Sequence, residues 1–161
     1  MKWHRVAYVM VLFMVPTAFA ESGSQQSFEK LKSLAGTWEG KMSNGQAVRE
    51  SYRVTANGSA VMSEIEGEHN MVTMFHLDGD RLLMTHYCGA GNQPRMKAVP
   101  AGNGNSVAFD FLDATNLASP DSGHMHRAVF TLVDNKHLSE EWVWKKDGKE
   151  TKEHFELQRV K

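Results

Sequence analysis

The sequence predicts an all-β fold: an antiparallel up-and-down barrel of about ten strands, preceded by one short helix. Apolar and polar residues alternate from residue 37 to the end of the chain, and turn signals interrupt the alternation at fairly regular intervals. No helix-length insert lies between the turns, so parallel crossovers are excluded and consecutive strands should pair antiparallel. An open sheet of this size would expose two long edges, which closure into a barrel removes.

The first 20 residues are expected to be a signal peptide rather than part of the fold. Residues 2–5 are mostly basic, residues 6–15 are apolar, and residues 18–20 end in a small-x-small cleavage pattern. The apolar run is shorter than the roughly 20 residues that a membrane span needs. We therefore expect an exported protein, periplasmic or secreted, that begins at Glu21 and has no stable membrane span.

Residues 21–161 are expected to form a single barrel domain, because no linker-like change in composition divides them. Without the leader the chain has 16 basic and 19 acidic side chains, a net charge of −3. This charge argues against a nucleic-acid partner and against a polybasic membrane anchor. Cys88 is the single cysteine, so no intrachain disulfide can form, and packing and hydrogen bonds must stabilise the domain.

One amphipathic helix is expected at residues 24–35, before the alternation begins. Its apolar side chains Phe28, Leu31 and Leu34 recur at a spacing of three and would cover one face. Ser24 or Ser27 is the candidate N-cap, and Gly36 is the expected stop.

Nine turn signals separate ten strand-like runs. The turns are Asn44-Gly45, Asn57-Gly58, residues 67–69, Asp78-Gly79, residues 89–92, residues 102–105, residues 120–123, Asp134-Asn135 and Asp147-Gly148.

The alternation predicts which side chains point into the barrel. On the second and third strands, the inward set is Val48, Glu50, Tyr52, Val54, Val61, Ser63 and Ile65. On the last three strands, two-residue turns would bring Arg127 to the same face as Glu140, Trp142, Trp144 and Glu153. The predicted interior is therefore partly polar.

The stretch from Met71 to Met96 holds the densest set of reactive side chains. Both of its faces are apolar enough to be buried, and we expect the face with Thr73, Phe75, Met84, His86 and Cys88 to point inward. A four-residue loop at residues 89–92 would add Gln93 and Arg95 to this face. The polar end of a bound ligand would then lie at that corner.

The segment Leu34-Ala35-Gly36-Thr37-Trp38-Glu39-Gly40 resembles the calycins, which include lipocalins, fatty-acid-binding proteins and the haem-binding nitrobindins. In these proteins a short helix leads into a Gly-x-Trp at the start of the first strand, and a basic residue of the last strand packs over the Trp. Gly36, Trp38 and Arg159 match these positions. The segments around Thr85 to Cys88 and Asn92 to Arg95 also resemble exported bacterial barrel proteins of unknown function.

The resemblance implies a cavity that binds a small hydrophobic or amphipathic ligand, acidic if an inward arginine meets it. The candidate ligand-binding residues are His86, Cys88, Gln93, Arg95, Arg127, Glu140, Trp142 and Trp144. Arg127 could bind a ligand carboxylate, with Trp142 and Trp144 covering the apolar tail. It could instead form an internal ion pair with Glu140 or Glu153. The sequence leaves both roles open.

No cofactor or metal is predicted. A haem of the nitrobindin kind is the alternative, but the alternation sends His154 outward, so that His86 or His76 would have to bind the iron. His124-Met125-His126 resembles a soft-metal site in which two imidazoles at i and i+2 share an ion. The sequence offers no third or fourth ligand.

An enzymatic function is the less favoured hypothesis. The chain has no Gly-x-Ser-x-Gly, His-Glu-x-x-His, Gly-rich phosphate loop or Cys-x-x-Cys. The catalytic alternative uses His86, Cys88 and Arg95 at the mouth of the barrel, where Arg95 would have to stabilise the thiolate or orient the base.

Overall fold

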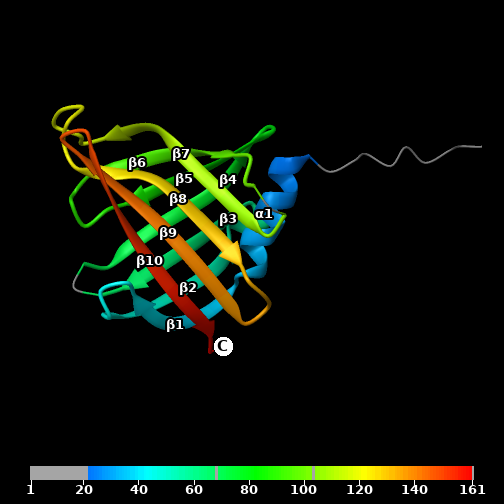
Figure 1. Cartoon of the computed structure of the whole chain (residues 1–161). Coiled ribbons are helices and arrows are strands. Elements are labelled where there is room, and N and C mark those ends of the chain that lie inside the picture. Colours follow the sequence, from blue (N-terminus) through cyan, green and yellow to red (C-terminus); the bar gives the residue numbers. More distant parts are fainter. Residues whose placement is uncertain (1–21, 68, 103, 161) are drawn as a thin grey trace, which may run out of the picture.

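The computed structural model describes residues 22–67, 69–102 and 104–160. The predicted signal peptide, residues 1–20, lies outside these residues. Figure 1 shows the described elements, which are α1 (Gly23–Ser33), β1 (Gly36–Met42), β2 (Ala47–Thr55), the 3₁₀ turn η1 (Ala56–Gly58), β3 (Ala60–Glu66), β4 (Met71–Asp78), β5 (Arg81–Tyr87), β6 (Gln93–Val99), β7 (Ser106–Thr115), β8 (His124–Leu132), β9 (His137–Lys146) and β10 (Lys149–Arg159).

The ten strands form one closed antiparallel barrel. Each strand pairs with its neighbours in sequence, and β1 pairs with β10 to complete the ring. The predicted fold class is therefore confirmed. Among the described residues, no helix is long and apolar enough to cross a membrane.

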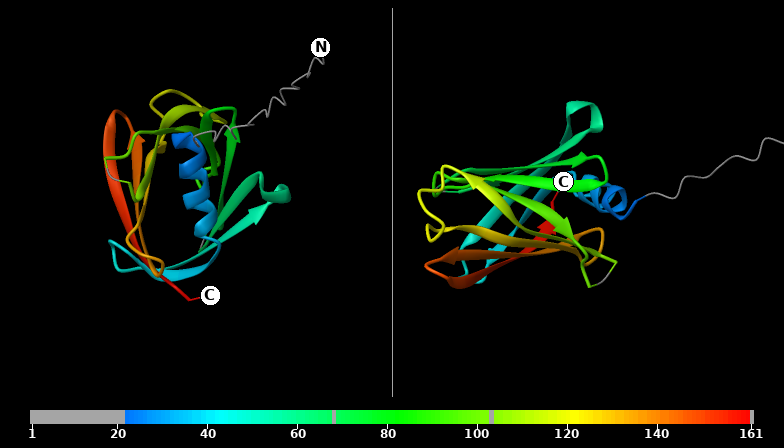
Figure 2. Two further views of the ribbon diagram at one scale, coloured as in Figure 1. Left: turned by 90° about the vertical axis from the view of Figure 1, so that its right-hand side faces the viewer. Right: turned by 90° about the horizontal axis from the view of Figure 1, so that it is seen from above.

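Helix α1 lies across one end of the barrel (Figure 2), and the connection between β7 and β8 lies at the opposite end (Figure 1). The helix begins earlier than expected, because the Oγ of Ser22 caps it by accepting a hydrogen bond from the Gln25 N–H at 3.2 Å. Phe28, Leu31 and Leu34 are buried, as the spacing predicts.

The corner between α1 and β1 is built as the calycin resemblance implies. Trp38 is fully buried, and its Nε1–H donates to the Leu34 carbonyl at 2.8 Å. The Arg159 guanidinium lies 4.2 Å from the centre of the Trp38 ring. It also donates to the carbonyls of Ser33, Ala35 and Asn135, at 2.8, 2.6 and 2.9 Å. Arg159 thus joins the end of the helix to the last strand.

The barrel interior is filled by side chains. Every predicted inward residue of β2 and β3 is buried except Val54, and Thr73, Phe75, Met84 and His86 are buried on β4 and β5. Phe75, Phe109, Phe130 and Trp142 form the centre, with ring centroids 5.5 to 6.0 Å apart. The prediction that the His86 face points inward is confirmed.

The expected inward position of Arg127 is wrong. Leu132 pairs with Leu138, and the Val133 N–H donates to the His137 carbonyl, so the connection of β8 to β9 has three residues, 134–136, rather than two. Because side chains alternate, this one-residue change reverses the faces of β8. Ala128 and Phe130 point inward, while Arg127 lies on the outer wall and pairs with Asp110.

The expected inward positions of Gln93 and Arg95 are wrong for the same kind of reason. The Cys88 N–H donates to the Asn92 carbonyl, so the loop between β5 and β6 has three residues, 89–91, rather than four. Pro94 and Met96 are consequently buried on the His86 face. Arg95 pairs with Thr85 in the sheet and binds Asp113 on the outer wall.

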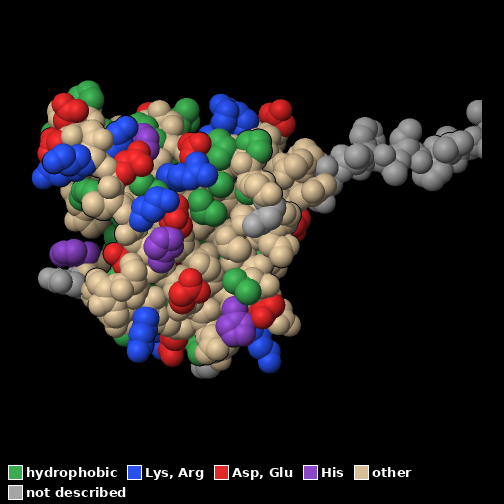
Figure 3. Space-filling view, in the orientation of Figure 1, with side chains coloured by type: hydrophobic (Ala, Val, Ile, Leu, Met, Phe, Trp, Pro, Cys, Tyr) green, Lys and Arg blue, Asp and Glu red, His purple; other side chains and the backbone are tan. Residues whose placement is uncertain are grey.

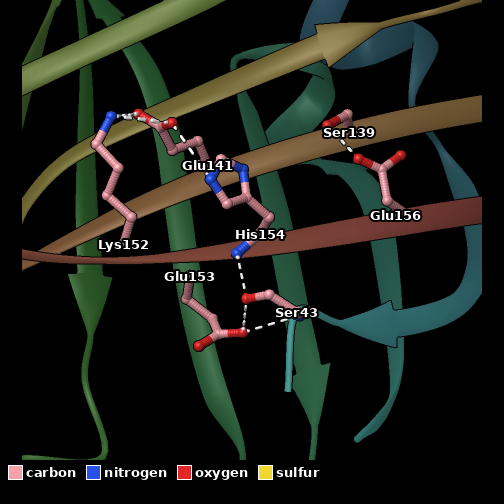
Figure 4. Close-up of polar contacts among 7 residues, drawn as sticks. All are labelled: Ser43, Ser139, Glu141, Lys152, Glu153, His154 and Glu156. Atoms are coloured by element: carbon pink, nitrogen blue, oxygen red, sulfur yellow. Dashed lines mark hydrogen bonds and ion pairs between the residues drawn. The ribbon is translucent and has the colours of Figure 1, made fainter. Parts of the chain in front are cut away.

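Acidic and basic side chains are interspersed over the face of the molecule in Figure 3. Lys152 and His154 of β10 both contact the Glu141 carboxylate, at 3.1 and 3.5 Å (Figure 4). Glu153 turns to the rim instead and accepts a hydrogen bond from the Ser43 N–H at 3.0 Å. Glu153 therefore does not form the internal ion pair with Arg127 that was one of the alternatives for that arginine.

Replacing Trp38 with Ala should lower the free energy of unfolding by about 3 kcal/mol or more, because the change empties a buried site and removes the ring beneath Arg159. Tyr87→Ala is the matched control, since Tyr87 is 49 % exposed on β5. Urea unfolding of both variants measures the difference. An unchanged midpoint for Trp38→Ala would contradict the role of this corner.

Candidate functional site

A layer of polar side chains crosses the barrel interior. On one wall, β2 to β5 place four of them side by side, because Tyr52 pairs with Ser63, Ser63 with Thr73, and Thr73 with His86. On the other wall, β9 contributes Glu140 and Trp142. Glu50 of β2 completes the layer. The members, all buried, are Glu50, Tyr52, Ser63, Thr73, His86, Glu140 and Trp142.

Glu140 is the centre of the hydrogen-bond network. The Tyr52 hydroxyl donates to its Oε1 at 2.6 Å, and the Trp142 Nε1–H donates to its Oε2 at 2.8 Å. The first bond crosses the barrel from β2 to β9. Both carboxylate oxygens are therefore satisfied, as a buried charge requires.

Glu50 is the second buried carboxyl, and its pKa lies well above the ordinary value because of burial and the nearby Glu140 charge. The Ser63 hydroxyl donates to its Oε1, while no donor among the described residues reaches its Oε2. A proton on Glu50 lets its carboxyl group donate a hydrogen bond to Glu140. Burial also raises the pKa of Glu140, which its hydrogen bonds from Glu50, Tyr52 and Trp142 oppose. We infer that Glu50 is neutral and Glu140 carries the charge.

His86 is neutral at physiological pH, because burial lowers its pKa to about 4. Its Nδ1 lies 2.9 Å from the Thr73 Oγ1, and its ring lies 4.9 Å from the Trp142 ring. Its Nε2 has no partner among the described residues. The ring packs inside a filled interior and is not at an open surface.

The polar layer brings together three of the eight candidate ligand-binding residues: His86, Glu140 and Trp142. Arg95 and Arg127 lie on the outer wall, and the amide of Gln93 accepts hydrogen bonds from Thr115 and Asn116. Cys88 is half-buried, and burial raises the pKa of its thiol. The structure therefore does not bring His86, Cys88 and Arg95 together, since Arg95 lies on the outer wall, and burial disfavours the thiolate form of Cys88.

A second site lies where β7 and β8 separate. Their ladder runs from the Ser106–Thr131 pair to the Asp110–Arg127 pair, although both strands continue beyond it. Each strand has an extra residue just past this point, Leu112 in β7 and His126 in β8. Such bulges bend a strand and interrupt pairing. We call the opening the β7–β8 split.

A cavity of about 580 Å³ lies in the β7–β8 split. Its lining residues are Phe111, Leu112, Asp113, Ala114, Leu117, Ala118, Ser119, Pro120, His124, His126 and Lys145. Most of them are apolar, and Asp113 is already bound by Arg95. Lys145 forms no ion pair with any described residue, so it is the free positive charge of the cavity.

Two imidazoles and a phenyl ring form the floor of the cavity. The Phe111 ring centroid lies 4.5 Å from that of His124 and 5.3 Å from that of His126. His124 is buried, its Nδ1 lies 2.8 Å from the Ser122 carbonyl oxygen, and its Nε2 lies 3.2 Å from the His126 Nδ1. These rings are held in place by packing and hydrogen bonds.

The loop of residues 116–123 forms one wall of the cavity and is tied to its neighbours. The Asn92 side-chain amide donates to the Gly123 carbonyl at 2.8 Å, and the Asp147 N–H donates to the Asp121 carbonyl at 3.0 Å. Trp144 lies directly on Gly123, where a Cβ would be 2.2 Å from its Cζ2. Only glycine fits there, so Trp144 serves to seat this loop.

The sequence had singled out His124 and His126, but not as parts of a pocket. Phe111 and Lys145 were missed entirely as site residues, as were Glu50, Tyr52, Ser63 and Thr73, although the alternation had placed the last four inside. An inward carboxylate opposite an inward tyrosine is the signal that could have identified the polar layer. The bulges that open the split have no comparable signal in the sequence.

The three histidines that the sequence offered as haem ligands, His76, His86 and His154, do not line the cavity of the β7–β8 split. His154 lies on the outer wall beside Glu141, as Figure 4 shows, and His76 is also exposed. His86 packs against Trp142 and Thr73 inside the filled barrel. We therefore propose no haem.

Glu50→Gln should change how stability depends on pH. The pKa of Glu50 is higher in the folded protein than in the unfolded chain, where it is near 4.5. The stabilisation that this difference provides is complete below pH 4.5 and is lost as the pH rises toward the pKa of the folded state. Glutamine has the shape and donor of the neutral carboxyl and never ionises. The free energy of unfolding of Glu50→Gln, relative to that of the native protein, should therefore increase between about pH 5 and pH 8.

Urea unfolding at both pH values measures this shift. The matched control is Glu39→Gln, which removes a carboxylate from the outer wall, where Glu39 pairs with Arg49. His86 titrates in both chains and cancels from the comparison. Parallel pH profiles for Glu50→Gln and the native protein would show that Glu50 is ionised in the folded state.

No protein-family model matches the chain, and no curated protein matches it. Among solved structures it is similar to a protein of unknown function from the DUF3598 family of Nostoc punctiforme PCC 73102. That match has a TM-score of 0.55 and 13 % identity over 81 % of this chain, which spans about half (49 %) of the other protein. It is also similar to Rv2717c from M. tuberculosis, with a TM-score of 0.58 and 11 % identity over 84 % of this chain and 98 % of that one. At such identities the likeness shows the fold alone, a ten-stranded barrel that fits a calycin-like class.

Proposed function

We propose that the protein binds a small amphipathic molecule with an acidic head group in the cavity of the β7–β8 split. The observation that carries this proposal is the cavity itself, an apolar concavity with a few convergent polar groups. Its volume of about 580 Å³ lies within the range of roughly 300–1,000 Å³ that is typical of small-molecule sites.

The apolar part of the ligand would lie against one wall of the cavity. Leu112, Leu117, Ala118 and Pro120 supply this wall, and Leu112 is 49 % exposed. Large apolar side chains left open to water in a concave surface are typical of binding sites. Covering them with a hydrocarbon chain would gain about 25 cal/mol per Å² of apolar surface removed from water.

The head group would lie toward Lys145 and the two imidazoles. Lys145 is the free positive charge of the cavity, whereas Asp113 is held by Arg95. An acidic head group would therefore be attracted by Lys145, which stands opposite Glu150 in the β9–β10 ladder. Arg95 and Arg127, which the sequence offered for this role, lie outside and already bind aspartates.

The barrel centre is a less suitable place for the ligand. Phe75, Phe109, Phe130 and Trp142 occupy it, and a buried carboxylate lies beside them in the polar layer. An acidic head group there would meet the charge of Glu140. The proposal therefore keeps the class of ligand expected from the sequence and moves it to the split.

We also propose that the protein belongs to the calycins and is exported. The corner formed by α1, Trp38 and Arg159 supports the first proposal. The leader pattern of residues 1–20 supports the second.

Lys145→Gln should weaken the binding of an acidic amphiphile. A partly exposed charge pair contributes up to about 1 kcal/mol, so the Kd of decanoic acid should rise about 3- to 5-fold. The Kd of decanol, which has the same chain and no charge, should not change. Isothermal titration calorimetry in the presence of EDTA measures both values.

Lys97→Gln provides the matched control, because Lys97 is an exposed lysine of β6 outside the cavity. Leu117→Asp provides a second variant, which places a carboxylate in the apolar wall and should weaken both ligands. Equal affinities of the native protein, Lys145→Gln and Leu117→Asp for both ligands would refute the site.

Export predicts that the mature protein begins at Glu21. Intact-mass measurement of protein released from the periplasm or recovered from the medium should give the mass of residues 21–161. A cytosolic protein that retains Met1 would contradict export.

A further inference from the structure

We propose that His124 and His126 form a two-imidazole chelating site for one divalent late transition-metal ion, Cu²⁺ above Ni²⁺ and Zn²⁺. The site lies on the floor of the β7–β8 split. It goes beyond the binding of an amphiphile and needs no such ligand to be tested.

The distance between the two ring nitrogens suits a shared ion. The His124 Nε2 and the His126 Nδ1 lie 3.2 Å apart. Two nitrogens each about 2.0–2.1 Å from one metal ion are about 2.8–3.4 Å apart in square-planar or tetrahedral geometry. Rotation of the two rings that turns both lone pairs toward one point would let an ion bridge them at this spacing.

The tautomer of His124 is also the one that a metal ligand needs. Its Nδ1 lies 2.8 Å from the Ser122 carbonyl oxygen, which can only accept, so this nitrogen carries the proton. The Nε2 then presents a lone pair. Metal-binding histidines usually donate their second N–H to such a group. In the free protein the His126 Nδ1–H donates to that lone pair. A bound ion would take the place of this proton, and His126 would then carry its proton on Nε2.

Packing holds both rings close to the chelating arrangement. Phe111 contacts both rings, and the plane of its own ring is 26° from that of His126. His126 is the extra residue in β8, and its ring centroid lies 5.4 Å from that of His124. The side chains therefore lose little conformational freedom when the ion binds.

The protein supplies two ligands to this site. Within the described residues, no cluster of three or more His, Cys, Asp and Glu side chains is placed to hold a metal ion together. The remaining coordination positions face the cavity and are open to water. Lys145 lines the same cavity and repels a cation. The carboxylates of Asp110 and Glu150 favour a positive charge at His126. Cu²⁺ should bind most tightly, because it stands highest in the usual order of divalent affinities.

Copper titration of the EDTA-stripped full chain tests the proposal. We expect one tight Cu²⁺ site, with an electron paramagnetic resonance spectrum that shows two coupled imidazole nitrogens. His126→Gln should raise the Kd about 10-fold or more and leave one nitrogen, as expected when a chelate loses an arm. His154→Gln, which removes an exposed histidine from the outer wall, should change neither property.

Lys145→Gln separates this site from the proposed function. Removing the lysine charge should tighten Cu²⁺ binding while it weakens decanoic acid, so the two proposals stand or fall independently. A folded His126→Gln protein with the Cu²⁺ affinity of the native chain would overturn the metal site. So would a native spectrum with fewer than two imidazole nitrogens.

Discussion

Closure of the sheet through the β1–β10 ladder is the constraint on which the rest of the structure depends. At Gly40 the two strands approach so closely that a Cβ would lie 1.8 Å from the Glu156 carbonyl oxygen, so this position accepts only glycine. Trp38 and Arg159 then join the closed ring to the helix across its end. A closed interior excludes water, so an inward polar group depends on partners from the barrel itself. Glu140 has such donors in Tyr52 of β2 and Trp142 of β9, whereas the His86 Nε2 has no partner among the described residues.

The filled interior is the reason why we place the proposed ligand in the wall of the barrel. Aromatic rings and the polar layer occupy the centre, whereas the β7–β8 ladder stops at the Asp110–Arg127 pair. Beyond that pair the two strands diverge, and their side chains line a cavity that opens to solvent. A hydrogen bond from Asn92 holds the loop of residues 116–123, and the Phe111 ring packs on His124 beside the cavity. In the proposed function, the barrel is the frame for a binding site in its wall.

The sequence predicted the barrel, the helix and the Trp38–Arg159 corner, because alternation, turn residues and the calycin motif report local geometry. It also predicted the inward faces of β2 to β5. The errors at Arg127 and Arg95 each came from a loop length that differed by one residue, which reverses a strand's faces. The β7–β8 split could not be predicted, because the bulges at Leu112 and His126 depend on pairing between strands rather than on residue type. The cavity residues therefore come from the structure, and the ligand class comes from the sequence.

The claim that the ligand lies in the wall of the barrel can be tested by mapping amide chemical shifts. Decanoic acid is added to ¹⁵N-labelled, EDTA-treated protein, and the shift of each backbone amide is followed by nuclear magnetic resonance. The account predicts the largest changes in residues 111–120 and around His124, His126 and Lys145, with little change at Thr73 and His86. Changes centred on Thr73, His86 and Glu140 would contradict it, because they would place the ligand inside the barrel.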